Sequence, residues 1–250
     1  MNVITFDIGN SRIKADIWSD HNHISHYTLE TIEEAISLVT QHLPDGVALC
    51  SVATDTTDIY SRLSATFNGF VKCFTSQSSL REDIEESYRG QLGADRLAAF
   101  LGAVSLFPDE ALMIVDSGTA LTIDVVDSNG IFRGGNISLG IGSRLKALHE
   151  FTARLPLVEV TGKVSEFGNS TDTAIRNGAI LGATGEILYE FEKAKLSYGV
   201  KRIIFTGGDA NIIIPFIARE GINVYHDPYL VGRGLNEGLL ISRQATVSTN

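Results

Sequence analysis

The chain has 250 residues, of which 44% are hydrophobic and 20% charged, and its formal net charge is −10. Such a composition is that of a globular protein with a sizeable core, not of a disordered chain. The acidic balance, without a cluster of lysines and arginines, makes nucleic acid and anionic membranes poor partners. No apolar run reaches the ~20 residues of a membrane span, and a charge comes as early as Asp7, so we expect a cytoplasmic protein.

The first part of the chain predicts a hairpin followed by alternating strands and helices. Thr31 and Glu34 have the capping-box spacing that begins a helix. In chain order we expect strands 3–7, 13–18 and 24–29, a helix from Thr31, strand 47–52, helix 57–67 and strand 70–74. This order predicts a mixed sheet covered by helices, unlike the strict alternation of a dinucleotide-binding fold.

The second part of the chain repeats this order after a helix at 95–106. The expected elements are strands 111–116, 121–126 and 130–137, helices 143–152 and 171–198, strand 202–206, and helices 210–219 and 232–243. Phe6–Ser11 and Val115–Ala120 are the clearest repeat, because each is an apolar strand that ends in Asp-x-Gly and a small polar residue. We therefore predict an α/β protein of two duplicated half-domains, 1–108 and 109–250, flanking a central cleft.

The first repeated turn has the residue types of a phosphate site. Asp7 ends a buried strand, Gly9 allows backbone N–H groups to approach an anion, and Lys14 returns on the next strand. A carboxylate at this place can hold Mg²⁺ together with phosphate oxygens. An ordinary hairpin with Asp as its turn residue is the alternative.

A second turn, Asp116–Asp124, and a third glycine element, Thr206–Gly208, strengthen the phosphate interpretation. Two facing loops are what a kinase with a cleft requires, and Gly207 and Gly208 end a strand where a helix begins, which suits a nucleotide. Neither a Walker A sequence nor a GxGxxG after a strand is present, so a P-loop NTPase and a dinucleotide oxidoreductase lose their main support.

Gly93–Arg96 lies between the two halves at the expected beginning of a helix. Asp95 in the first helical turn, beside Arg96, would stay ionised and suits a proton acceptor for a substrate hydroxyl. Arg96 suits a substrate carboxylate. An N-terminal helix cap followed by a surface arginine is the alternative.

Cysteine and histidine spacing predicts no metal site. Cys50 and Cys73 each end an apolar run, as buried reduced thiols do. His21 and His23 fall in an expected surface turn, so we predict that their side chains are solvated.

The ordered set of motifs resembles the type III pantothenate kinases, a family of the acetate and sugar kinase/actin superfamily, over about residues 3–240. The motifs that carry the resemblance are Asp7-x-Gly-Asn-Ser-x-x-Lys14, Gly93-x-Asp95-Arg96, Asp116-x-Gly-Thr-Ala-x-Thr-x-Asp124, Gly134-Gly135-x-Ile137 and Thr206-Gly-Gly208. It implies half-domains of the ribonuclease H-like, actin and sugar-kinase type. It also implies phosphorylation of pantothenate by ATP to 4'-phosphopantothenate, the first step of coenzyme A biosynthesis.

The resemblance further implies roles for individual residues. Asp95 would be the catalytic proton acceptor, and Asp7 would hold Mg²⁺ through the phosphates. Asp116 would bind a monovalent cation, K⁺ or NH₄⁺. The implied ATP-binding residues are Asp7, Ile8, Gly9, Asn10, Ser11, Arg12, Ile13, Lys14 and Thr119. The implied pantothenate-binding residues are Tyr88, Gly93, Ala94, Asp95, Arg96 and Thr171, the last reaching across the interface of a homodimer.

The chain departs from the family pattern at two places. The family's tyrosine and Asn/Thr-Pro pair upstream of Gly-x-Asp-Arg are replaced by Ser87–Gln91, which lacks proline and puts Tyr88 about two positions closer to Asp95. The family's proline after Gly-Gly-x-Ile is Leu139 here. Two other functions are open: a kinase of another sugar or hydroxy acid, and a transcriptional accessory protein that has lost catalysis.

Overall fold

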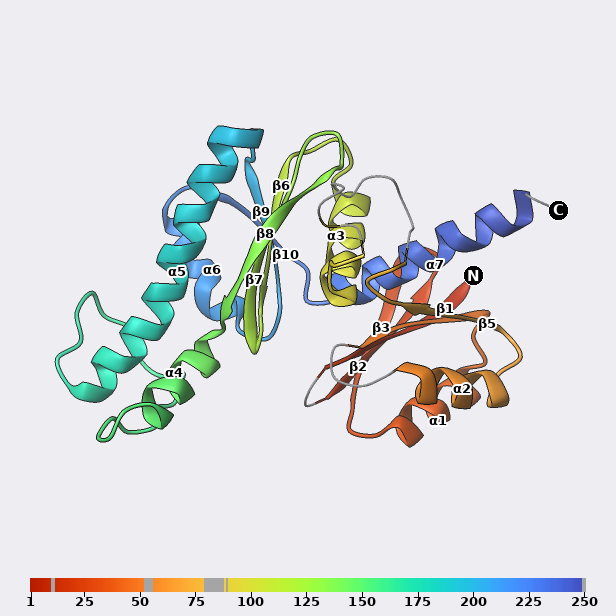
Figure 1. The fold of residues 1–250 in the computed structure, drawn as a ribbon, viewed down its shortest axis with the longest axis horizontal. Helices are drawn as coiled ribbons and strands as arrows, with labels where there is room; N and C mark the ends of the chain where they lie inside the picture. The colour runs from red at the N-terminus through yellow and green to blue at the C-terminus, as the bar shows by residue number, and fades with distance from the viewer. Residues whose placement is uncertain (10–11, 52–55, 79–87, 89, 249–250) are drawn as a thin grey trace. The chain divides into compact units, whose positions relative to one another are not determined.

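The computed structural model describes residues 1–9, 12–51, 56–78, 88 and 90–248. By its internal contacts the chain divides into two compact units, which we call unit 1 (residues 1–108 with 229–250) and unit 2 (residues 109–228). The predicted halves, 1–108 and 109–250, differ from this division in the C-terminal helix, because that helix packs on the sheet of unit 1. Each unit is described by itself below (Figure 1).

Unit 1 is a mixed five-stranded sheet with helices on both faces (Figure 1). The strand order is β3-β2-β1-β4-β5, with β1, β2 and β3 antiparallel and β4 and β5 parallel to β1. The elements are β1 Asn2–Ile8, β2 Ile13–Ser19, β3 Asn22–Leu29, α1 Ile32–His42, β4 Gly46–Ser51, α2 Thr56–Thr66, β5 Phe70–Phe74, α3 Ala94–Leu106 and α7 Leu230–Ser248. The predicted mixed sheet is confirmed.

Helix α1 begins where the capping box predicted it. Thr31 Oγ1 accepts a hydrogen bond from the N–H of Glu34 (3.2 Å), and Glu34 Oε2 accepts one from the N–H of Glu30 (2.7 Å). The buried face of α1 carries Leu38 and Val39, which join a cluster with Phe6 and other apolar residues of the sheet. Helices α1 and α2 therefore cover one face of this sheet, and α3 and α7 pack together on the other.

Helices α3 and α7 touch through their backbones at two glycines. A Cβ added to Gly234 would lie 1.6 Å from the carbonyl oxygen of Ala98, and one added to Gly102 would lie 2.5 Å from that of Leu230. Any side chain at either position would force the helices apart, so the glycines determine how closely α3 and α7 approach each other.

His23 was predicted to be solvated, and this prediction is wrong. Its side chain belongs to a polar cluster around the buried Asp16, next to the beginning of α7. Asp16 is 3% exposed, and its Oδ1 is bonded by His23 Nε2 (2.9 Å) and His26 Nδ1 (2.8 Å). The ring of Tyr229 stacks on that of His23 with centroids 3.9 Å apart. His21 is exposed as predicted and bonds Glu237. His23 escaped the prediction because its partners come from a neighbouring strand and from the far end of the chain.

Unit 2 repeats the topology of unit 1. Its sheet runs β10-β9-β6-β7-β8, which read in reverse matches the order of the first sheet, and its strand pairings are antiparallel and parallel at the same places. The elements are β6 Leu112–Ser117, β7 Ala120–Val126, β8 Phe132–Leu139, α4 Ile141–Glu150, α5 Thr171–Tyr198, β9 Arg202–Thr206, α6 Ala210–Arg219 and β10 Asn223–His226. The predicted duplication is confirmed. Strand β10 was missed because it has only four residues and no fully buried one.

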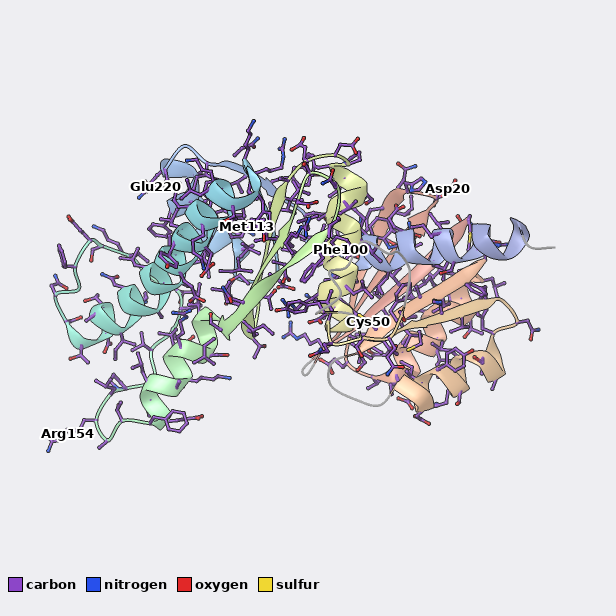
Figure 2. All side chains as sticks on the ribbon, turned by 45° about the horizontal axis from the view of Figure 1, so that its top comes forward. Asp20, Cys50, Phe100, Met113, Arg154 and Glu220 are labelled. Atoms are coloured by element: carbon purple, nitrogen blue, oxygen red, sulfur yellow. The ribbon has the colours of Figure 1, made fainter. Side chains whose placement is uncertain are left out.

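Helices α5 and α6 bury their apolar faces against one side of this sheet, around Met113 and Val115 (Met113 is labelled in Figure 2). Helix α5 spans the predicted range, because Ser170 and Thr173 form a capping box at its start and Gly199 ends it with a φ of 73°. Along the described ranges of both units, no helix is long and apolar enough to cross a membrane.

Gly234→Ala tests the backbone contact between α3 and α7. The added methyl group would overlap the carbonyl of Ala98, and overpacking of this kind costs about 1–3 kcal/mol of unfolding free energy. Chemical denaturation of the variant and of Ser37→Ala, which places the same residue at an exposed position of α1, provides the comparison. A change in Gly234→Ala no larger than that in Ser37→Ala would show that the helices are not held this closely.

Candidate functional site

A polar site forms at the carboxyl end of β1 in unit 1. Strand register places Asp7 directly opposite Lys14 on β2 and Cys50 on β4, so all three side chains project from the same face of the sheet. Lys14 Nζ lies 3.8 Å from Asp7 Oδ2, and the thiol of Cys50 donates to Asp7 Oδ1 at 3.9 Å (Cys50 is labelled in Figure 2). The side chain of Asp7 is only 17% exposed.

The charge of Asp7 is unfavourable in this environment. Burial raises its pKa, Lys14 opposes the rise, and the negative charges of Asp95 and Asp16 add to it. The influence of Asp95 shows that the two predicted site carboxylates, from β1 and α3, lie near each other. A cation placed there would be attracted to both carboxylates, so this part of unit 1 fits a divalent metal carried by phosphate oxygens.

A backbone hydrogen bond closes the turn between β1 and β2. The N–H of Gly9 donates to the carbonyl of Arg12 at 3.1 Å, and Arg12 itself is exposed. Ile8 and Ile13 are each 6% exposed and pair with each other, so only their backbones face the turn. Asn10 and Ser11, which were predicted to bind phosphate, lie outside the described residues.

The predicted substrate segment begins helix α3. Gly93 occupies the N-cap position without a side-chain cap, and a Cβ there would lie 2.7 Å from Asp95 Oδ1. Asp95 is half-buried in the first turn, whereas Ala94 and Arg96 are buried. The guanidinium of Arg96 lies 5.9 Å from the ring centroid of Tyr88, so these two predicted pocket residues are neighbours. Arg96 is not the surface residue that the alternative interpretation required.

The corresponding site of unit 2 lies at the carboxyl ends of β6 and β9. Asp116 pairs with Thr206 across the two parallel strands. Gly207 follows with a φ of +89°, and a Cβ there would lie 2.4 Å from Asp116 Oδ1. Only a glycine therefore lets the backbone at position 207 approach the carboxylate of Asp116 this closely. A carboxylate at the end of a strand, with backbone oxygens near it, suits a bound cation.

The predicted ATP residue Thr119 is exposed at the tip of the β6–β7 turn, directly after Gly118. Thr171 is the first residue of α5 and is exposed as well. Large apolar side chains stand in solvent near these elements, Phe151 (86% exposed) after α4 and Phe167 (82%) before α5.

Among the residues that the sequence patterns singled out, Asp7 and Lys14 lie 3.8 Å apart in unit 1, and Asp116 and Thr119 lie on the same β6–β7 segment in unit 2. The patterns missed Cys50 as a partner of Asp7. They also missed Ser143, which bonds the Thr119 turn, and Asp209, which interacts with the beginning of α4. Only strand register could have revealed Cys50. In the described part of the chain, no group of three or more His, Cys, Asp or Glu side chains is arranged to hold a metal ion.

Comparison with known proteins gives a consistent family. The sequence model of the type III pantothenate kinases matches residues 3–192. A type III pantothenate kinase of Porphyromonas gingivalis is 47% identical over 58% of this chain, and the match spans 60% of that protein's length. One from Azobacteroides pseudotrichonymphae is 33% identical over 96% of this chain and 97% of its own length.

Two solved structures share the fold. One, from Campylobacter jejuni, was described as a Baf family transcriptional activator and has a TM-score of 0.65 at 22% identity, covering 96% of this chain and 99% of its own. The other, described as an N-acetylmannosamine kinase from Listeria monocytogenes, has a TM-score of 0.61 at 14% identity, covering 98% and 100%. The family match and the near full-length relative decide the assignment: the chain belongs to the type III pantothenate kinase family.

Proposed function

We propose that this protein transfers the terminal phosphoryl group of ATP to the primary hydroxyl of pantothenate, which yields 4'-phosphopantothenate and begins coenzyme A biosynthesis. The observation that carries the proposal is the carboxylate of Asp7 at the end of β1, 3.8 Å from the ammonium of Lys14 and within the electrostatic influence of Asp95. These three residues supply a metal-binding carboxylate, a phosphate-binding cation and a proton acceptor. Membership of the family supports the choice of acceptor.

The nucleotide is bound by the backbone and side chains of Asp7–Lys14 and by Thr119. Gly9 allows close approach of a phosphate, and the half-exposed ammonium of Lys14 neutralises part of its charge. Asp7 holds Mg²⁺, directly or through water, together with phosphate oxygens. The metal supplies charge neutralisation for the transferred group. The raised pKa of Asp7 falls when a cation binds, so metal binding and ionisation of Asp7 favour each other.

Asp95 accepts the proton of the pantothenate hydroxyl as the oxygen attacks phosphorus. Its place in the first turn of α3 puts this side chain at the helix N-terminus, which carries partial positive charge. Gly93, Ala94 and Tyr88 line the acceptor side of the pocket, and Arg96 attracts the pantothenate carboxylate. Because Arg96 is buried, its charge is screened less by solvent than that of a surface arginine.

A panel of acceptors tests the reaction as a whole. ADP release coupled to a spectrophotometric assay is expected with pantothenate and not with hexoses or other small hydroxy acids at the same concentration. Turnover of a sugar in preference to pantothenate would favour the other kinase interpretation. ATP binding without turnover of any acceptor would favour a protein that has lost catalysis.

Asp95→Asn tests the proton acceptor. The amide keeps the size of the side chain but cannot take the proton, and removal of a general base costs about 10²–10⁴ in rate. We expect that loss in kcat with a nearly unchanged dissociation constant for ATP. Asp58→Asn, at an exposed first-turn position of α2, is the matched control. Wild-type turnover in Asp95→Asn would remove Asp95 from this role.

The carboxylate of Asp116 is assigned to K⁺ or NH₄⁺. We expect turnover in either salt and a much lower rate in Na⁺ alone, at equal ionic strength and saturating Mg²⁺. Gly207→Ala would place a methyl group against Asp116 Oδ1, so this variant should lose activation by K⁺. Equal rates in the three salts would contradict the assignment.

The protein acts as a homodimer in which Thr171 of one chain reaches the pantothenate pocket of the other. Thr171 is exposed, and large apolar side chains stand in solvent on the neighbouring segments, among them Phe151, Leu157 and Phe167. Burial of these exposed apolar side chains against a second chain would be favourable. A second copy of this chain agrees with the role that the family resemblance gives to Thr171.

Mixing two inactive variants tests the shared site. In a dimer of Asp95→Asn and Thr171→Arg chains, one of the two sites carries both native residues. Random exchange makes half of the dimers hybrid, so activity should return to about one quarter of the wild-type rate. Sedimentation of the wild type as a monomer, or no recovery after demonstrated subunit exchange, would overturn the proposal.

A further inference from the structure

The beginning of α4, residues Gly140–Ser143, is hydrogen-bonded to the Thr119 turn. The carbonyl oxygen of Thr119 accepts two hydrogen bonds from it, one from the N–H of Gly140 (3.0 Å) and one from Ser143 Oγ (2.7 Å). The contact is close, because a Cβ added to Gly140 would lie 1.9 Å from the carbonyl oxygen of Gly118.

The same helix start is bonded to the turn that follows β9, residues Gly207–Asp209. The backbone N–H of Gly142 interacts favourably with the carboxylate of Asp209, and it opposes the rise in pKa that burial causes there. The N–H of Asp209 in turn donates to the carbonyl of Ser117 at 2.9 Å. The beginning of α4 therefore contacts both glycine turns that the sequence analysis associated with nucleotide.

Helix α4 is itself fixed in place. Arg144 donates from Nε to the carbonyl of Leu139 (2.7 Å) and from a terminal nitrogen to Ser138 Oγ (3.2 Å), and it forms an ion pair with Glu186 of α5. The helix is thus anchored to β8 and to α5, so it can serve as a rigid support and does not follow the turns if they move.

The outer side of both turns is open. Thr119 is exposed, and a Cβ on Gly208 or Gly142 would meet no atom within 4 Å. Ser143 is the third residue of α4, whose N-cap is Gly140, and it donates its hydroxyl hydrogen out of the helix to the Thr119 carbonyl.

We propose that Ser143 and Asp209 are positioning residues for ATP, which fix the Thr119 turn and the Gly207–Asp209 turn at a set separation through the beginning of α4. The inference rests on the proposed function, in which Thr119 binds the nucleotide. Both turns carry exposed or small residues, so in the absence of this support they would sample several conformations. Holding them in one conformation before ATP arrives lowers the ordering cost of binding.

The test is direct binding of a non-hydrolysable ATP analogue by calorimetry, without any acceptor. Ser143→Ala removes one hydrogen bond, so we expect the dissociation constant to rise about threefold to tenfold. Ser143→Thr keeps the hydroxyl and should restore most of the affinity. Ser105→Ala removes a hydroxyl that bonds a carbonyl within α3, and it should leave the affinity unchanged.

Asp209 gives a second, independent variant pair. Asp209→Ala removes the acceptor for the Gly142 N–H, while Asp209→Asn keeps an oxygen that can accept it, so the alanine variant should bind the analogue more weakly than the asparagine variant. In turnover assays, KM for ATP should rise in Ser143→Ala and Asp209→Ala while KM for pantothenate stays constant. A positioning role therefore raises KM for ATP alone, whereas general damage to the fold would raise KM for both substrates.

The outcomes separate the inference from the function on which it rests. Unchanged analogue binding in both folded alanine variants, or failure of Ser143→Thr and Asp209→Asn to restore it, would overturn the positioning role. A wild-type protein that binds the analogue but does not phosphorylate pantothenate would overturn the proposed acceptor and leave the positioning role intact. A wild type that does not bind the analogue would overturn both.

Discussion

Burial of a carboxylate at the end of the central strand of unit 1 is the constraint around which the proposed site is arranged. Burial alone raises the pKa of Asp7, and nearby Asp95 and Asp16 add to the penalty. Lys14 and the Cys50 thiol compensate only in part, because the lysine is 3.8 Å away and half-exposed. The protein thus holds an unfavourable concentration of negative charge that a cation and a phosphate group would relieve. Such an arrangement disfavours the ligand-free state and favours metal–nucleotide binding.

The duplicated topology supplies two such strand ends, yet the two units use them differently. In unit 1 the strand end meets a helix start that carries a second carboxylate, Asp95, which suits proton transfer. In unit 2 Asp116 meets a glycine with positive φ, Gly207, which packs closely against the carboxylate and adds no charge. The same order of strands therefore gives one site suited to the reaction and another suited to holding a cation and the nucleotide.

Glycines set the geometry where backbones must touch. Gly102 and Gly234 let α3 and α7 meet directly, which fixes the helix that carries Asp95 against the first sheet. Gly140 does the same between α4 and the Thr119 turn. The high glycine content is thus explained at these positions by contact between main chains, and the ligand-facing glycines, such as Gly208, are the ones with open space beside them.

The sequence by itself determined the mixed sheets, the duplication and the family, because these depend on local periodicity and on short motifs that mark strand ends. The same motifs singled out Asp7, Asp95 and Asp116 as candidate site residues. It could not show that His23 is clamped between Asp16 and Tyr229, that Cys50 faces Asp7, or that the last helix belongs with unit 1. Strand β10 was too short to leave a pattern. Contacts of this kind join residues far apart in the chain, and strand register and helix packing, which no local pattern encodes, decide which of them meet.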